Sequence, residues 1–197
     1  MRFSVIMPSR LIPYKGSCQF PQQKIIRAIQ SVLDQTFRDF ELIVISDDCL
    51  KTKEIVSKEF TGVRLLECKH KAVFDNLPRN IGIQNAKGDY ITYLDINDYW
   101  GSDHLSVIDR QLKEYDWVWY NDIIFKDGQW IERACNIKAM GGCGTSNVCY
   151  KRSLNLKWDR PGYAHDFYFN QKLVRFKGTK IETPEYFVCH IPNNYDL

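Results

Sequence analysis

Short, mostly apolar runs of strand length mark the first hundred residues. The runs from Phe3 to Met7, from Phe40 to Ile45 and from Ile91 to Leu94 are rich in β-branched or aromatic side chains. Such runs are typical of the buried strands of a parallel sheet, which are covered on both faces. We therefore expect three central strands at these positions.

Between these runs the pattern changes to helical spacing. Apolar side chains recur three and four positions apart from Ile25 to Leu33, which predicts a helix that reaches about Gln35. A charged helix is expected from about Lys51 to Phe60, and a further strand from Val63 to Glu67. This alternation of strand and helix predicts an α/β fold with a doubly wound, mostly parallel sheet.

The second half of the chain has a different pattern. A helix is expected from about Ser102 to Tyr115, followed by a strand from Trp117 to Tyr120. The Asp127-Gly128 pair, between the apolar runs 123–125 and 130–131, is a hairpin signal. We therefore expect a small antiparallel sheet beside the parallel one.

The composition indicates one domain that covers residues 1–197. A chain of this length with 44% hydrophobic residues can bury one substantial core. Its seven cysteines are odd in number and include no C-x-x-C pair, which favours reduced thiols over a disulfide frame or a zinc site. These cysteines are Cys18, Cys49, Cys68, Cys135, Cys143, Cys149 and Cys189.

Several classes of protein are disfavoured. The apolar start is too short for a signal peptide, and no run approaches the roughly 20 apolar residues of a membrane span. A net charge of +3 and a pI near 8.4 are mild for a nucleic-acid-binding protein. We therefore expect a soluble, cytoplasmic protein that has no membrane span and no nucleic-acid partner.

Oxygen-bearing side chains gather directly after the strand 91–94. Asp95, Asn97 and Asp98 lie within four positions, where the carboxyl end of a parallel strand opens into a ligand-binding crevice. Mg²⁺ and Mn²⁺ take carboxylate and amide oxygens, so a metal-diphosphate site is expected. The alternative is a polar turn that caps the next helix.

The stretch from Arg79 to Asp98 resembles the central motif of the family 2 glycosyltransferases, roughly A-R-N-x-G-I-x-x-A-x-G-x-Y-I-x-F-L-D-x-D-D. Residues 4–9 are similar to its opening S-V-I-I-P-T segment, and residues 42–49 to E-I-I-V-V-D-D-G-S. The resemblance implies a GT-A fold, with a Rossmann-like, mostly parallel central sheet, helices on both faces and a small antiparallel acceptor-side sheet. Residues 1–100 would then form the nucleotide-binding half and residues 101–197 the acceptor-binding half.

The resemblance also implies which residues bind the nucleotide. A carboxylate can accept hydrogen bonds from a base or a ribose, and a guanidinium matches phosphate oxygens. The alternatives are helix capping by the aspartates and an exposed helix position for the arginine. The Arg10 position departs from the family's usual Tyr-Asn. The candidates are Pro8, Ser9, Arg10, Asp47, Asp48, Arg79, Asp95 and Ile96.

A metal site and a general base complete the candidates. Asp95, Asn97, Asp98 and His190 are the expected ligands of Mn²⁺ or Mg²⁺, although Asn97 is a poorer ligand than the aspartate the family has there. Asp166 matches the family's catalytic carboxylate, and His165 replaces its usual Glu. The alternatives are a helix-capping role for Asp166 and an incidental His190.

The tryptophans permit two interpretations. Trp100, Trp119, Trp130 and Trp158 could each stack on a sugar ring, although aromatic side chains more often belong to the core. The sequence alone favours the core for each of them.

Taken together, these patterns predict a metal-dependent inverting glycosyltransferase. It would move a sugar from a UDP-sugar, with UDP-glucose as the first candidate, to an acceptor hydroxyl of a glycan or glycoprotein. The chain is similar to small soluble glycosyltransferases of large algal DNA viruses, which would place it in a host cytoplasm. The alternatives are a non-catalytic nucleotide-sugar-binding module and a nucleotidyltransferase, although residues 9–20 lack the latter's Gly-rich, Arg-containing loop.

Overall fold

A seven-stranded sheet lies at the centre of the computed structural model, which describes residues 1–12, 20–71, 76–182 and 185–189. In spatial order its strands are β10 (Gly178–Ile181), β6 (Trp117–Tyr120), β9 (Val148–Lys151), β4 (Tyr90–Tyr93), β1 (Phe3–Ser9), β2 (Phe40–Asp47) and β3 (Arg64–Cys68). Strand β9 runs antiparallel to its neighbours β4 and β6, and the other neighbouring pairs are parallel. The expected mostly parallel sheet is therefore confirmed.

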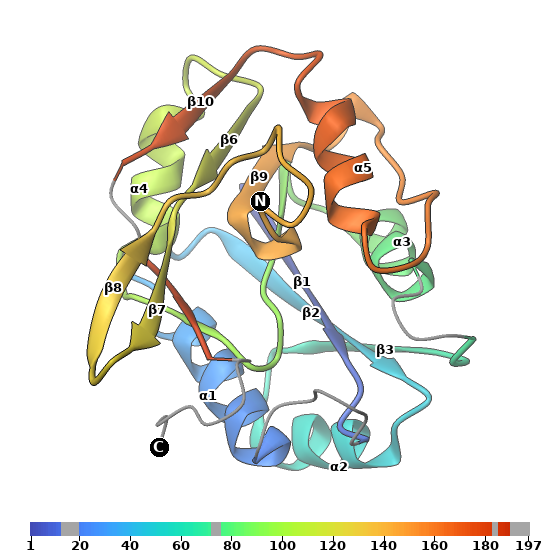
Figure 1. Ribbon diagram of the computed structural model, residues 1–197. Helices are drawn as coiled ribbons and strands as arrows, with labels where there is room; N and C mark the ends of the chain where they lie inside the picture. The colour runs from blue at the N-terminus through green and yellow to red at the C-terminus, as the bar shows by residue number, and fades with distance from the viewer. Residues whose placement is uncertain (13–19, 72–75, 183–184, 190–197) are drawn as a thin grey trace.

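Helices cover both faces of this sheet. Alternate side chains of β1 point to opposite faces, so that Val5 and Met7 belong to one core cluster and Ile6 to another. The first cluster is covered by α1 (Pro21–Leu33), α2 (Leu50–Glu59) and α4 (His104–Gln111), and the second by α3 (Leu77–Asn85) and α5 (His165–Leu173). Figure 1 shows α3 and α5 close together on one side of the molecule, with α1 and α2 on the other. Burial on both faces explains why the central strands are so uniformly apolar.

A small second sheet is built from the second half of the chain together with β5. Its strands, in spatial order, are β5 (Tyr99–Trp100), β11 (Tyr186–Val188), β7 (Asp122–Lys126) and β8 (Gln129–Arg133). Strands β7 and β8 form the expected hairpin, whose turn residues Asp127 and Gly128 have φ angles of 52° and 81°. The pair β11–β7 is parallel and the other two pairs are antiparallel. Two 3₁₀ turns, Thr145–Asn147 and Arg152–Leu154, flank β9.

Two helices differ from their expected bounds. Helix α1 begins at Pro21, because proline lacks a backbone N–H and suits the first helical position. Helix α4 is shorter than the expected 102–115 and ends at Gln111. Within the described ranges, no helix has the length and apolar character that crossing a bilayer requires.

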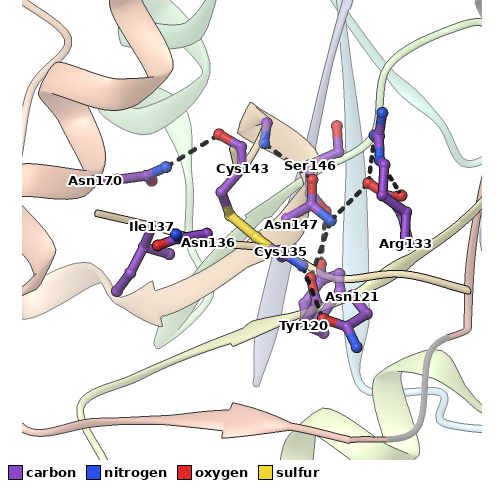
Figure 2. Close-up of a disulfide and its surroundings, with 12 residues drawn as sticks. Tyr120, Asn121, Arg133, Cys135, Asn136, Ile137, Cys143, Ser146, Asn147 and Asn170 are labelled. Atoms are coloured by element: carbon purple, nitrogen blue, oxygen red, sulfur yellow. Dashed lines mark hydrogen bonds and ion pairs between the residues drawn. A yellow bond between two sulfur atoms is a disulfide. The ribbon is translucent and has the colours of Figure 1, made fainter. Parts of the chain in front are cut away.

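A disulfide joins Cys135 to Cys143, which corrects the expectation of reduced thiols only (Figure 2). The backbone N–H of Asn136 donates to the carbonyl of Gly142 at 2.7 Å, so the intervening turn brings the two cysteines together. Spacing in the sequence could not show this turn. The side chain of Asn170, on α5, donates to the carbonyl of Cys143 at 3.2 Å, and the closed loop therefore contacts α5.

The disulfide is expected to stabilise the fold, because it restricts the unfolded chain. Reduction with dithiothreitol, or replacement of Cys135 and Cys143 by serine, should lower the free energy of unfolding by about 2 to 3 kcal/mol for a loop of this length. Urea unfolding measures the change. The double serine variant is the control, since reductant should leave its stability unaltered. Equal stability of the wild-type protein with and without reductant would contradict the assignment.

Asp98 connects the second sheet to the central one. Its side chain is only 1% exposed. One carboxylate oxygen accepts the backbone N–H of Cys189 at 2.7 Å, and the other accepts the hydroxyl of Tyr186. Both partners lie on or next to β11, so Asp98 holds this strand against the segment that follows β4. A role as metal ligand would have to compete with these two hydrogen bonds.

Asp98→Ala should therefore destabilise the protein even without metal. Two buried donors would lose a charged acceptor, which is expected to cost about 2 to 4 kcal/mol in the free energy of unfolding. The measurement is urea unfolding in EDTA, with Asp89→Ala, an exposed aspartate, as the control. An Asp98→Ala protein as stable as the wild type in EDTA would refute this structural role.

Candidate functional site

The carboxyl ends of β1, β2 and β4 meet at one edge of the central sheet. Ser9 pairs with Ser46 across β1 and β2, and Ile6 pairs with Tyr93 across β1 and β4. The ladder continues past β4, because the backbone N–H of Leu94 donates to the carbonyl of Ile6 at 3.2 Å. Parallel pairing thus brings Asp95 to the same edge as the ends of β1 and β2.

Asp47, the last residue of β2, has a fixed orientation. Its Oδ2 accepts a hydrogen bond from Nδ1 of His70 at 2.7 Å, and its Oδ1 accepts one from Sγ of Cys68 at 3.6 Å. Nη1 of Arg10 donates to the backbone carbonyl of Asp47 at 3.0 Å. The structure therefore brings two separate candidates, Arg10 and Asp47, together, and His70, which was not among the candidates, holds the carboxylate.

The other nucleotide-binding candidates near Asp47 differ in solvent exposure. Asp48 is exposed in a left-handed conformation, with φ of 50°. The N-cap residue of helix α2 is Cys49. The alternative that Asp47 or Asp48 caps this helix is therefore wrong. The Ser9 hydroxyl is buried and hydrogen-bonded to that of Thr52 at 2.7 Å. Pro8 is half-buried beside it.

Arg79 extends from the first turn of α3 toward Asp95. Its side chain is 11% exposed, and Nη2 lies 3.8 Å from Oδ1 of Asp95. The guanidinium carbon is 5.2 Å from the centre of the Trp158 ring, a cation–π contact. Among the described residues, its buried Nε has no hydrogen-bond partner. Arg79 is therefore not the exposed helix arginine of the alternative interpretation.

Trp158 connects the elements around this arginine. It is 3% exposed, so it belongs to the core and is not a sugar platform. The side-chain amide of Asn80 bonds both the carbonyl and the N–H of Trp158, at 2.7 and 2.9 Å. The indole N–H donates to the Tyr93 hydroxyl at 3.0 Å, and the ring stacks on Phe169 of α5 at 4.0 Å. One side chain thus links α3, β4 and α5.

The loop after β4 places one carboxylate at the sheet edge. The side chain of Asp95 is 39% exposed, and its backbone N–H donates to the Ser146 hydroxyl at 3.1 Å. Ile96 and Asn97 are half-buried, and the carbonyl of Asn97 accepts Nη2 of Arg27 at 2.8 Å. Asp95 therefore remains accessible to a ligand.

Three of the four metal ligands expected from the sequence, Asp95, Asn97 and Asp98, lie within the described residues. His190 lies outside the described residues. Within the part of the chain that the structure describes, no group of three or more His, Cys, Asp or Glu side chains is arranged to hold a metal ion. Asp95 can still supply a carboxylate oxygen to a divalent ion whose remaining ligands are phosphate oxygens and water, which is how Mg²⁺ commonly binds. The donor atoms thus fit a shared metal-diphosphate site better than a closed protein site.

Asp166 is brought to this group by α5. It is the second residue of the helix, which follows the N-cap residue Ala164, so it is an acidic first-turn residue and not the cap itself. Burial raises the pKa of Asp166, the charges of His165 and Arg79 oppose this rise, and the charge of Asp95 adds to it. Trp158 packs against both Arg79 and the ring of His165, and His165 contacts Asp166, so Asp166 lies beside the Arg79–Asp95 pair at the carboxyl edge of the sheet.

Sequence reasoning assigned no role to His70, and it identified His165 only as the replacement for the family's usual Glu. His70 lies two positions after Cys68, the end of β3, and residues two apart on an extended segment share a face. Because β3 is the neighbour of β2, that spacing could have indicated an approach to Asp47. The spacing of residues in the sequence does not indicate how the ring of His165 is oriented.

Comparison with solved structures identifies the same fold in other proteins. The solved structure of Staphylococcus aureus TarS residues 1–349 in complex with UDP superimposes with a TM-score of 0.73 at 17% identity, over 95% of this chain and 60% of that one. The complex of the same protein with UDP-GlcNAc gives a TM-score of 0.74, also at 17% identity, over 100% of this chain and 60% of that one. At this identity the likeness shows the shared fold.

Relatives detected by sequence are glycosyltransferases. The amylovoran biosynthesis glycosyltransferase AmsB of Erwinia amylovora is 30% identical over 142 residues, which are 66% of this chain and 44% of AmsB. The poly(ribitol-phosphate) beta-N-acetylglucosaminyltransferase TarP of Staphylococcus aureus strain N315 is 36% identical over 81 residues, 39% of this chain and 25% of TarP. The chain spans less than half the length of these curated relatives. The family described as glycosyl transferase family 2 matches residues 9–190, and the chain therefore belongs to glycosyltransferase family 2.

Proposed function

We propose that this protein transfers a glycosyl group from a UDP-sugar to an acceptor hydroxyl with inversion at the anomeric carbon. The observation that carries the proposal is the group formed by Arg79, Asp95 and Asp166 at the edge where β1, β2 and β4 end, with Asp166 linked to Arg79 through His165 and Trp158. A nucleotide-binding carboxylate, a phosphate-binding guanidinium and a half-buried base are the parts that this reaction needs. They come from three separate segments that the sheet and Trp158 hold together.

The nucleotide half of the site recognises the donor. Asp47 presents a carboxylate, held by His70, that can accept a hydrogen bond from the uracil N–H or a ribose hydroxyl. Arg79 is largely buried and already pairs with Asp95 through Nη2, but its Nε–H has no hydrogen-bond partner among the described residues, so a diphosphate oxygen could accept from it. The structures of TarS with UDP and with UDP-GlcNAc support a UDP-sugar as the donor class. UDP-GlcNAc and UDP-glucose are therefore the first donors to test.

A divalent ion, Mn²⁺ or Mg²⁺, fits beside Asp95. The carboxylate of Asp95, with Asn97 and His190 as further candidates, would hold it together with the donor's phosphates. When bound, such an ion neutralises charge that develops on the departing diphosphate. Arg79 acts on the same charge from α3 and stays in place without the ion.

Asp166 is the proposed general base. The acceptor O–H bond breaks as its proton passes to the carboxylate, and the acceptor oxygen forms the bond to the anomeric carbon. The bond between that carbon and the UDP oxygen breaks on the opposite side, and its electron pair leaves with the diphosphate. A carboxylate with a raised pKa holds the transferred proton more readily than an ordinary one, and burial provides that shift here. The acceptor is a glycan or glycoprotein hydroxyl in this proposal.

Asp166→Asn should abolish transfer and leave donor binding intact. Loss of a general base typically lowers kcat by about 10²- to 10⁴-fold, while Asp47 and Arg79 still bind UDP. UDP release from a panel of UDP-sugars with glycoside acceptors measures turnover, and titration calorimetry measures UDP affinity. The matched control is Asp159→Asn, an aspartate seven positions earlier that pairs with Lys172 at the surface. Full activity of Asp166→Asn would end the base assignment, and binding without any UDP release by the wild type would indicate a binding module.

Transfer should also depend on a divalent ion that acts through the diphosphate. EDTA is expected to abolish UDP release, added Mn²⁺ should restore it, and Asp95→Asn should raise the Mn²⁺ concentration needed. Binding of uridine, which has no phosphate, should not change with EDTA, and this serves as the control. Transfer at an undiminished rate in EDTA would rule out metal dependence.

A further inference from the structure

The start of α5 gives His165 a defined orientation. Gly162, with φ of 102°, forms a turn that an L side chain would strain, and its carbonyl faces the helix start. This carbonyl accepts the backbone N–H of His165 at 3.0 Å and Nδ1 of the same residue at 2.8 Å. Because a carbonyl can only accept, Nδ1 must carry a hydrogen. The ring is also packed edge-to-face against Trp158, at 5.6 Å between centroids.

The other ring nitrogen of His165 faces the general base. Nε2 lies 3.2 Å from Oδ1 of Asp166, an ion-pair distance. With Nδ1 protonated, a neutral ring would turn a lone pair toward the carboxylate, so a proton between Nε2 and Oδ1 makes this contact favourable. The pair therefore takes up and releases protons together.

The contact leaves the two oxygens of Asp166 unequal. Oδ1 is fully buried, and Nε2 of His165 meets it as an ion-pair contact, not as an aligned hydrogen bond. The Asp166 side chain is nevertheless 26% exposed, so its open polar atom is Oδ2. The other charged groups that act on the pair are Arg79 from α3 and Asp95 from the loop after β4.

We propose that His165 is a positioning residue for the reaction: from the start of α5 it holds Oδ1 of Asp166 and leaves Oδ2 as the atom that takes the acceptor's proton. This inference rests on the proposed function, in which Asp166 is the base. It gives a physical role to the histidine that stands next to the catalytic carboxylate. The turn at Gly162 and the ring of Trp158 are what orient it.

The pairing can be tested without any enzymatic activity. Long-range ¹H–¹⁵N NMR of the histidine rings should show neutral His165 as the Nδ1–H tautomer, with His165→Gln used for assignment. Burial already lowers the pKa of His165, and the Asp166 carboxylate opposes that effect, so Asp166→Asn should lower this pKa further. Asp159→Asn removes the same charge elsewhere and should leave it unaltered. An Nε2–H tautomer, or a His165 pKa that does not respond to Asp166→Asn, would overturn the proposal.

The kinetic test uses the full chain and UDP-GlcNAc or UDP-glucose. His165→Gln removes a charge that keeps the pKa of Asp166 from rising further. The acid limb of the kcat profile should therefore move to higher pH, and kcat near neutrality should fall roughly tenfold or more. UDP affinity should stay within about twofold, because neither Asp47 nor Arg79 is touched. An unmoved acid limb would refute the role of His165, whereas a wild-type protein without transfer, but with the expected NMR result, would refute only the proposed function.

Discussion

The parallel pairing of β1 with β2 and β4 is the constraint on which the rest of the structure depends. Parallel strands end at the same edge, so pairing brings the end of β2, with Asp47, next to the end of β4, with Asp95. The pairing is maintained by apolar side chains on both faces of β1, packed under helices on either side. A shift of one residue in this register would turn every one of those side chains to the opposite face and move the site residues apart.

Strand pairing does not position the proposed base, Asp166, which lies on helix α5. Asp166 lies more than 60 positions after β4 in the chain, and α5 packs on the sheet face opposite to α1. Trp158 fixes the approach of α5, since it stacks on Phe169 and bonds to Tyr93 of β4. Its ring also lies under Arg79, so the phosphate-binding and proton-accepting parts of the proposed site share one rigid support.

Local patterns in the sequence were sufficient for much of the fold. The helical and strand periodicities located the central strands, the hairpin turn at Asp127-Gly128 and the helices α1, α2 and α4 to within a few residues, because burial on one or two faces imposes those periods directly. They gave no bounds for α3 or α5. The family motif placed Arg79, Asp95 and Asp166 on elements that do converge. Metal binding and the donor sugar stay predictions, since they depend on ligands and on pocket shape.

By itself the sequence determined the α/β alternation and the positions of the polar strand ends, since both follow from short-range spacing. Only the tertiary structure decided how those polar groups are used. Asp98 faces inward to a partner 91 residues away, His70 bonds to Asp47 across 23 residues, and a turn closes Cys135 onto Cys143. The physical reason is that a hydrogen bond or a disulfide requires its atoms to be close in space. Contacts between distant segments form only when those segments pack, so the spacing of residues along the chain does not predict them.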